Sequence, residues 1–170
     1  MPAVISDSSP LINLAGIGRW GLLHEMFSEI IIPPSVWDEI ATSGDILPGA
    51  AEVREACGQG WISRKKPDNN HLVNLLCQDL HRGEAEAIVL ALELNADLIL
   101  LDETDARRVA ATFGLRKTGV IGILMRAKRE GTIDSLRFEL NALRERMGFY
   151  IDDQLYCRAL ASVEEYPDPE

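Results

Sequence analysis

The chain has 170 residues and a formal net charge of −10, from 17 Lys and Arg against 27 Asp and Glu. Hydrophobic residues make up 46% and charged residues 26%, which is ordinary for a folded domain, and the length predicts a single domain. The chain has neither the ~20-residue apolar run of a membrane helix nor the features of a signal peptide, so we expect a cytoplasmic protein without membrane contact. The acidic balance argues against tight nonspecific binding of nucleic acid, which depends on Lys and Arg.

Short apolar segments alternate with helical ones along the chain. Strands are predicted at 2–6, 29–32, 61–65, 97–101 and 115–119. Helices are predicted at 22–27, 34–44, 50–60, 68–80, 83–95, 103–114, 120–131, 134–148 and 152–165, several with Pro near the start or Gly at the end. Strands separated by helices predict a parallel sheet with helices on both faces. We expect one α/β domain over residues 1–165 and a loose tail at 166–170.

Two aspartates directly follow predicted strands. Asp7 follows the first strand, and Asp102 follows the segment at 97–101, which is apolar at almost every position and so predicted to be the most buried strand. In open parallel sheets, ligands bind beyond the carboxyl ends of the strands, so these carboxylates would meet if their strands are neighbours. Each could instead be the N-cap of the helix that follows it, since Asp is a favoured cap.

Two helical glutamates are candidates to join them. At ~100° per residue, Glu84 lies on the face of its helix that carries Ile88, whereas Glu86 lies opposite and is predicted to face solvent. Glu39 lies at the edge of the apolar stripe of its helix, while Asp38 points away. The alternatives are that Glu84 only complements the helix dipole and that Glu39 is a surface carboxylate.

Carboxylates gathered at one point stay ionised together only if a cation neutralises them. A ligand set made of oxygen alone favours Mg²⁺ or Mn²⁺, which typically polarise a phosphate and activate a water. Cysteine and histidine do not compete as ligands, because no CxxC or HxxxH spacing occurs among Cys57, Cys77, Cys157, His24, His71 and His81. The sequence therefore predicts a Mg²⁺ or Mn²⁺ site walled by acids.

The order of these motifs resembles a known superfamily. The motifs follow one another as in PIN domains, most closely those grouped with VapC-type toxins. In chain order they are Asp-Ser-Ser after a strand, "PPSVWDEI", "GEAEAI", "ADLILLDE" and "TGVIGIL". The separation of 18 positions between Glu84 and Asp102 is typical of the third and fourth acids of PIN domains. The resemblance implies a three-layer α/β/α sandwich with a parallel sheet of strand order 3-2-1-4-5.

The resemblance also implies a function, that of a metal-dependent ribonuclease which is the toxin of a toxin–antitoxin pair. Asp7, Glu39, Glu84 and Asp102 take the places of the catalytic acids. Asp7, Glu84 and Asp102 would hold Mg²⁺ or Mn²⁺, and Ser8 and Arg107 would contact substrate. Ser8 could instead cap the next helix, and Arg107 could form a salt bridge with Asp102 or Glu103. Glu84 departs from the Asp that many VapC toxins have there.

The expected partners are an RNA substrate, a cognate antitoxin and a second copy of the chain in a homodimer. An apolar cluster of Leu22, Leu23, Met26 and Phe27 could form a dimer face, although we expect it to be core. Positive charge near the site is expected from Arg64, Lys65, Lys66, Arg107 and Arg108. The alternatives are a catalytically silent PIN scaffold and a haloacid-dehalogenase-type phosphatase, which the serine at position 9 disfavours because that chemistry needs an acid two residues after Asp7.

Overall fold

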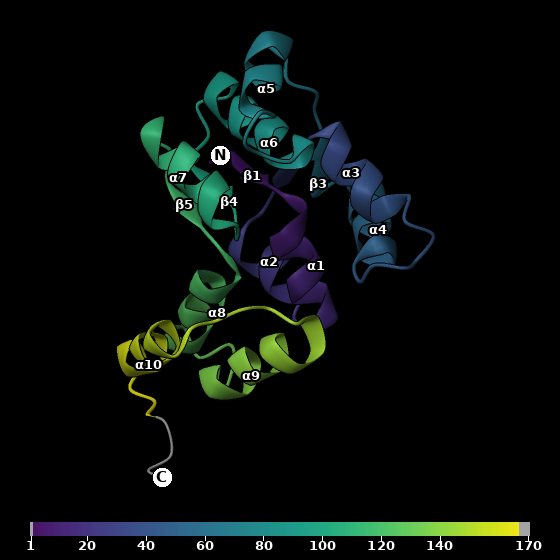
Figure 1. Ribbon diagram of the computed structural model, residues 1–170. Coiled ribbons are helices and arrows are strands. Elements are labelled where there is room, and N and C mark those ends of the chain that lie inside the picture. Colours follow the sequence, from purple (N-terminus) through teal and green to yellow (C-terminus); the bar gives the residue numbers. More distant parts are fainter. Residues whose placement is uncertain (1, 167–170) are drawn as a thin grey trace.

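The computed structural model describes residues 2–166, in which five strands alternate with helices (Figure 1). The strands are β1 (Val4–Ser6), β2 (Ile30–Ile32), β3 (Ile62–Arg64), β4 (Leu98–Leu100) and β5 (Lys117–Thr118). The first helices are α1 (Ser8–Gly16), α2 (Gly21–Met26), α3 (Pro34–Ala41), α4 (Ala50–Gln59) and α5 (Asn70–Leu76). They are followed by α6 (Arg82–Glu93), α7 (Thr104–Thr112), α8 (Val120–Arg129), α9 (Leu136–Met147) and α10 (Asp153–Ser162). The predicted tail at 166–170 lies outside the described residues except for Tyr166.

The sheet is parallel throughout, with strand order β3-β2-β1-β4-β5, as predicted. β1 lies at its centre, with Ile5 opposite Ile31 of β2 on one side and Ile99 of β4 on the other. The chain moves outward from β1 in one direction to β2 and β3, then returns to add β4 and β5 on the other side. The carboxyl ends of β1 and β4 therefore lie at the point where the strand order reverses, the usual place for a ligand site.

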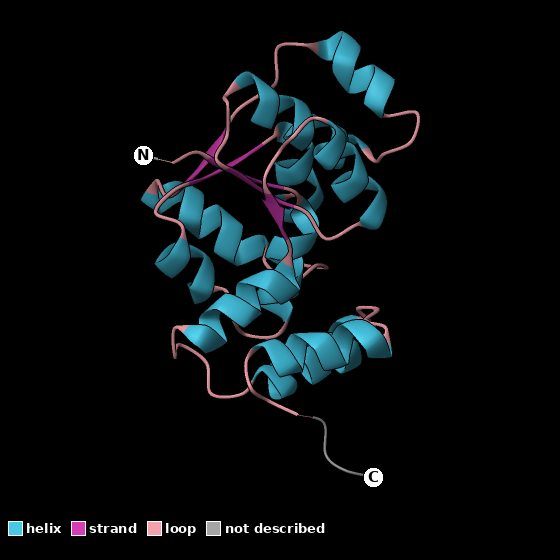
Figure 2. Ribbon diagram, turned by 90° about the vertical axis from the view of Figure 1, so that its left-hand side faces the viewer, coloured by secondary structure: helices cyan, strands magenta, loops and turns pink. Residues whose placement is uncertain are grey.

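Helices cover both faces of the sheet, so the three-layer prediction is confirmed (Figure 2). Side chains alternate between the faces, as the pleat of a strand requires. Ile5 and Ile99 pack against α5, α6 and α7 on one face. Val4 and Leu100 belong to the larger cluster on the other face, which extends through α1 and α8 to α9 and α10. No described helix is both long and apolar enough to cross a membrane.

The apolar cluster after α1 belongs to this core. Leu22, Leu23 and Phe27 are buried, and Met26 packs against them. A partly buried ion pair closes the same region, because Arg19 Nε donates at 2.8 Å to Oε1 of Glu139, a residue of α9 that is 1% exposed. The segment between α1 and α2 is thereby fixed to the C-terminal helices.

Glu86 differs from its prediction, because it is 5% exposed and not directed to solvent. Its Oε2 accepts a hydrogen bond from the backbone N–H of Ser35 at 3.0 Å, and its Oε1 accepts one from Arg82 Nε at 3.1 Å. Helix α3 begins after Pro33 and has no side-chain cap of its own. The carboxylate of Glu86 therefore satisfies the start of α3 from a neighbouring helix, where a negative charge also complements the helix dipole.

We expect Glu86→Ala to lower the free energy of unfolding by about 1–3 kcal/mol, because it leaves the partly buried Ser35 N–H without its acceptor. Urea denaturation followed by circular dichroism measures the change. Glu145→Ala, at an exposed position of α9, is the matched control and should stay within about 0.5 kcal/mol of wild type. Equal stability of the two variants would show that Glu86 does not support α3.

Candidate active site

Asp7 and Asp102 follow the two central strands and end at the same edge of the sheet. Ser6 lies opposite Leu100 in the β1–β4 pair, and the backbone N–H of Asp7 donates to the carbonyl of Leu100 at 3.1 Å. The pairing therefore continues one residue beyond β1 and holds the backbone of Asp7 against the end of β4. The convergence of the two strand ends that the sequence predicted is present.

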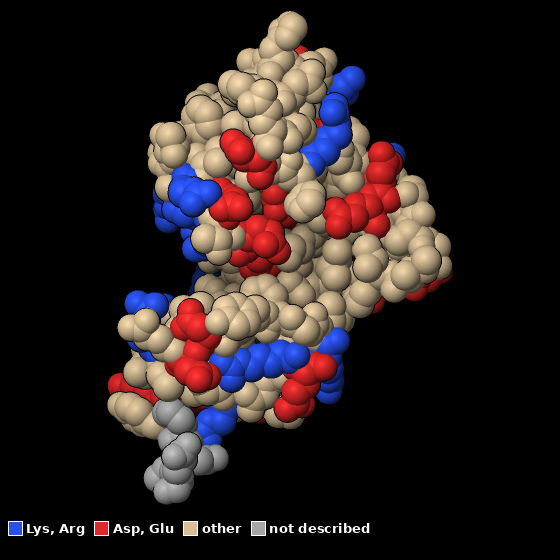
Figure 3. All heavy atoms as spheres, in the orientation of Figure 1, with Lys and Arg blue, Asp and Glu red and all other residues tan. Residues whose placement is uncertain are grey.

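Three of the four predicted acids line one hollow of about 480 Å³, formed by Asp7, Ser8, Ser9, Ser35, Glu39, His81, Arg82, Gly83, Glu84 and Glu103. Asp7 and Glu84 are nearly buried, at 4% and 5% exposure, and Glu39 is exposed at the mouth. Gly83 allows the wall to come close, since a Cβ there would lie only 3.2 Å from Oδ1 of Asp7. Figure 3 shows Asp and Glu side chains gathered in the upper half of the molecule, with Lys and Arg on either side of them.

Asp102 faces a second pocket beside this hollow, and its carboxylate is held from three directions. Oδ2 accepts from Ser9 Oγ at 3.2 Å and Asn13 Nδ2 at 3.3 Å, and Oδ1 accepts from the backbone N–H of Val120 at 2.7 Å. A Cβ on Gly119 would lie 2.5 Å from Oδ1, so only glycine leaves room for this contact. Asp102 therefore binds the start of α8. The alternative considered from the sequence was that Asp102 caps α7, the helix that follows it.

Burial and mutual repulsion perturb these acids. Burial is the largest of the causes that raise the pKa of Asp7 to about 7; the charges of Glu84, Glu39 and Asp102 act in the same direction, and the Ser8 N–H opposes them. Burial also raises the pKa of Glu84, opposed by the backbone N–H of His81, which donates to Glu84 Oε2 at 3.0 Å. The pKa of Asp102 is raised by burial, although its hydrogen bonds and Arg107 act in the opposite direction. Such shifts are frequent at functional sites.

The predicted substrate residues lie around these acids. Ser8 Oγ donates to Glu39 Oε2 at 2.6 Å and so orients that carboxylate. Arg107 lines the pocket of Asp102, where its Nη1 donates at 2.9 Å to the carbonyl of Leu101 and not to Asp102 or Glu103. Arg108 pairs with Asp105 instead of facing the site, and Arg64 stacks on Trp37 with its guanidinium carbon 4.2 Å from the ring centre.

Several residues of the site were not predicted. Asn13 contacts both Ser9 and Asp102, and its position four residues after Ser9 on one helix face could have revealed it. Arg82, His81 and Glu103 line the hollow, but their places depend on how α6 and α7 meet the sheet. His81 thus lines the acidic hollow, although the spacing of the histidines gave no reason to expect it at the site.

The donor chemistry fits a hard divalent cation, because Asp7, Glu84 and Asp102 offer only oxygen. None of these acids, nor Glu39, forms an ion pair with Lys, Arg or His within residues 2–166. A cation would therefore supply the missing positive charge. In the same part of the chain, no three side chains form a preformed set of metal ligands.

Comparison with protein-family models identifies the family of this chain. A family model described as a PIN domain (DUF3368) matches residues 3–165. A PilT N-terminus domain protein from the hyperthermophilic archaeon Sulfolobus solfataricus P2 is a similar solved structure, with 24% identity, a TM-score of 0.46, and coverage of 75% of this chain and 93% of that chain. Curated proteins show no significant match. The chain belongs to the PIN-domain family, and its fold is of the nuclease type.

Proposed function

We propose that this protein is a metal-dependent ribonuclease that hydrolyses RNA phosphodiester bonds, with Mg²⁺ or Mn²⁺ as cofactor. The observation that carries the proposal is the gathering of Asp7, Glu39 and Glu84 around one hollow, with Asp102 beside it and no cationic side chain paired to any of them in the described chain. Buried carboxylates without a counter-charge destabilise a fold, so their presence at a switch point of the sheet is best explained by function.

Each residue of the site has a separate role in this proposal. Asp7, Glu84 and Asp102 would hold the cation, which supplies Lewis acidity that polarises the phosphate and lowers the pKa of water. Ser8 holds Oε2 of Glu39 through its 2.6 Å hydrogen bond, which leaves Oε1 of Glu39 to accept the proton of the attacking water. Arg82 and Arg107, which line the two pockets, would bind phosphate oxygens on either side of the acids.

The resemblance of the motif order to VapC-type proteins supports a more specific role. We propose that the protein is the toxin of a toxin–antitoxin pair and acts as a homodimer in the cytoplasm. Induced expression in bacterial cells should then stop growth, whereas Asp7→Asn at the same protein level should not. Growth arrest by Asp7→Asn equal to wild type would separate toxicity from this site.

The first test is RNA cleavage by purified protein with Mn²⁺, with EDTA as the blank and DNA of the same sequence for comparison. Asp7→Asn and Asp102→Asn should each lower the rate by at least about 100-fold, because even outer-sphere changes at metal sites cost 10- to 100-fold. Asparagine keeps an acceptor for the Val120 N–H, so α8 should remain in place in Asp102→Asn. Asp38→Asn, next to Glu39 but exposed, is the matched control and should cleave normally. Full cleavage by Asp7→Asn would refute the proposed site.

The second test uses pH and metal. Because folding raises the pKa of Asp7 to about 7, the folded state keeps a proton that the unfolded state has released, and stability falls as pH rises from about 4 to about 7. In EDTA at pH 8, Asp7→Asn should therefore be more stable than wild type by up to about 4 kcal/mol, with no difference below pH 4.

Thermal unfolding with and without Mn²⁺ completes this test. Mn²⁺ should raise the Tm of wild type more at pH 8 than at pH 5, because protons compete with the cation for the carboxylates. Asp7→Asn should respond less to Mn²⁺ at both pH values. If Asp7→Asn were less stable than wild type at pH 8 in EDTA, ionised Asp7 would stabilise the fold. That result would contradict the repulsion between Asp7 and its neighbouring acids.

A further inference from the structure

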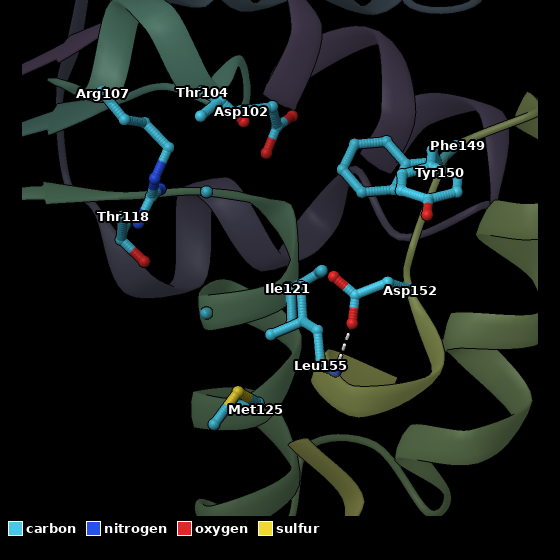
Figure 4. A pocket seen from close by; sticks show the side chains of 12 residues that line it. Asp102, Thr104, Arg107, Thr118, Ile121, Met125, Phe149, Tyr150, Asp152 and Leu155 are labelled. Atoms are coloured by element: carbon cyan, nitrogen blue, oxygen red, sulfur yellow. Dashed lines mark hydrogen bonds between the residues drawn. The ribbon is translucent and has the colours of Figure 1, made fainter. Parts of the chain in front are cut away.

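A second pocket of about 440 Å³ adjoins the acidic hollow and lies between the sheet and the C-terminal helices. Its polar lining is Asp102, Thr104, Arg107, Thr118 and Asp152, and its apolar side is built from Ile121, Met125 and Leu155. Phe149 and Tyr150, from the segment between α9 and α10, stand opposite Arg107 and Thr118 (Figure 4). The volume lies within the ~300–1,000 Å³ typical of ligand sites.

The two pockets are neighbours, because Asp102 lines one of them and contacts a residue that lines the other. The carboxylate of Asp102 accepts a hydrogen bond from Ser9 at 3.2 Å, and Ser9 lines the acidic hollow. A substrate whose phosphate lies at the acids would therefore have its next nucleotide at the mouth of the second pocket. Arg107 stands at that junction, where its guanidinium is fixed by the carbonyl of Leu101.

The backbone that carries Tyr150 is held on both sides, although the ring itself is 85% exposed. Phe149 N–H donates to the carbonyl of Leu143 at 3.1 Å, and Arg144 donates to the carbonyl of Ile151 at 2.6 Å. Asp152 Oδ1 accepts from Leu155 N–H at 2.7 Å and so caps α10. An aromatic ring on a fixed segment loses little conformational entropy on stacking, which is the property of a preorganised platform.

We propose that this pocket binds the nucleobase next to the scissile phosphate, with Tyr150 and Phe149 as stacking residues and Arg107 on the adjoining phosphate. The inference rests on the ribonuclease function proposed above and names the subsite that holds the substrate beside the acids. A pocket with an apolar floor, an aromatic wall and one arginine fits a nucleotide, which has flat apolar faces and an anionic link that Arg107 would bind. The stacking contact is tolerant of sequence, so it supplies affinity more than choice of base.

The test compares Tyr150→Ala, Tyr150→Phe and the control Tyr166→Ala in steady-state cleavage of a short single-stranded RNA. Tyr166 is 67% exposed and lies outside the pocket. Tyr150→Ala should raise KM by about 5- to 150-fold with kcat within about 3-fold, because one stacked base is worth ~1–3 kcal/mol. Tyr150→Phe should restore KM, since the ring and not the hydroxyl stacks, and Tyr166→Ala should match wild type.

An abasic scan distinguishes stacking from a structural effect. Removing the base at one of the two positions that flank the cleaved bond should raise KM for wild type as much as Tyr150→Ala does. For Tyr150→Ala, the same abasic RNA should give no further rise in KM, because the missing base and the missing ring remove the same contact. Equal KM values for wild type and Tyr150→Ala, or additive losses in this cycle, overturn the subsite and leave the pocket to a protein partner. If wild type neither cleaves nor binds RNA, the ribonuclease proposal fails together with the subsite.

Discussion

The parallel pairing of β1 with β4 is the contact on which the candidate site depends. Both strands end at the same level. Ser6 lies opposite Leu100, and the N–H of Asp7 donates to the carbonyl of Leu100. Neighbouring strands lie only ~4.8 Å apart, so acids that follow both strands must be close. The main chain thus brings the carboxylates together against their mutual repulsion, which their side chains alone would not do.

Asp102 extends this arrangement beyond the sheet. Its carboxylate binds Ser9 and Asn13 of α1 on one side and the first N–H of α8 on the other, and Gly119 leaves the space for that contact. Helix α8 packs in turn against α9 and α10, whose connecting segment carries Phe149 and Tyr150. The placement of the aromatic pocket is therefore linked to one catalytic candidate, since a shift of α8 would move both.

The buried acids of this protein fall into two kinds. Glu86 and Glu139 each pair with an arginine, and they fasten α3 to α6 and the α1–α2 segment to α9. Asp7 and Glu84 instead lie in a hollow where burial raises their pKa and no cationic side chain pairs with them in the described chain. The first kind stabilises the fold, and the second reduces its stability in a way that a bound cation would reverse.

The sequence by itself determined the alternation of strands and helices, the acids at the strand ends and the inward face of Glu84, because periodicity and chain order are local properties. It placed Glu86 wrongly, since a helical wheel describes one helix and not the N-terminus of α3, which comes from 51 positions away. The contact of Asp102 with α8 and the aromatic pocket also required the tertiary structure. These features depend on which segments pack side by side, and packing is decided by the whole core, whereas local sequence decides only which face of each element is apolar.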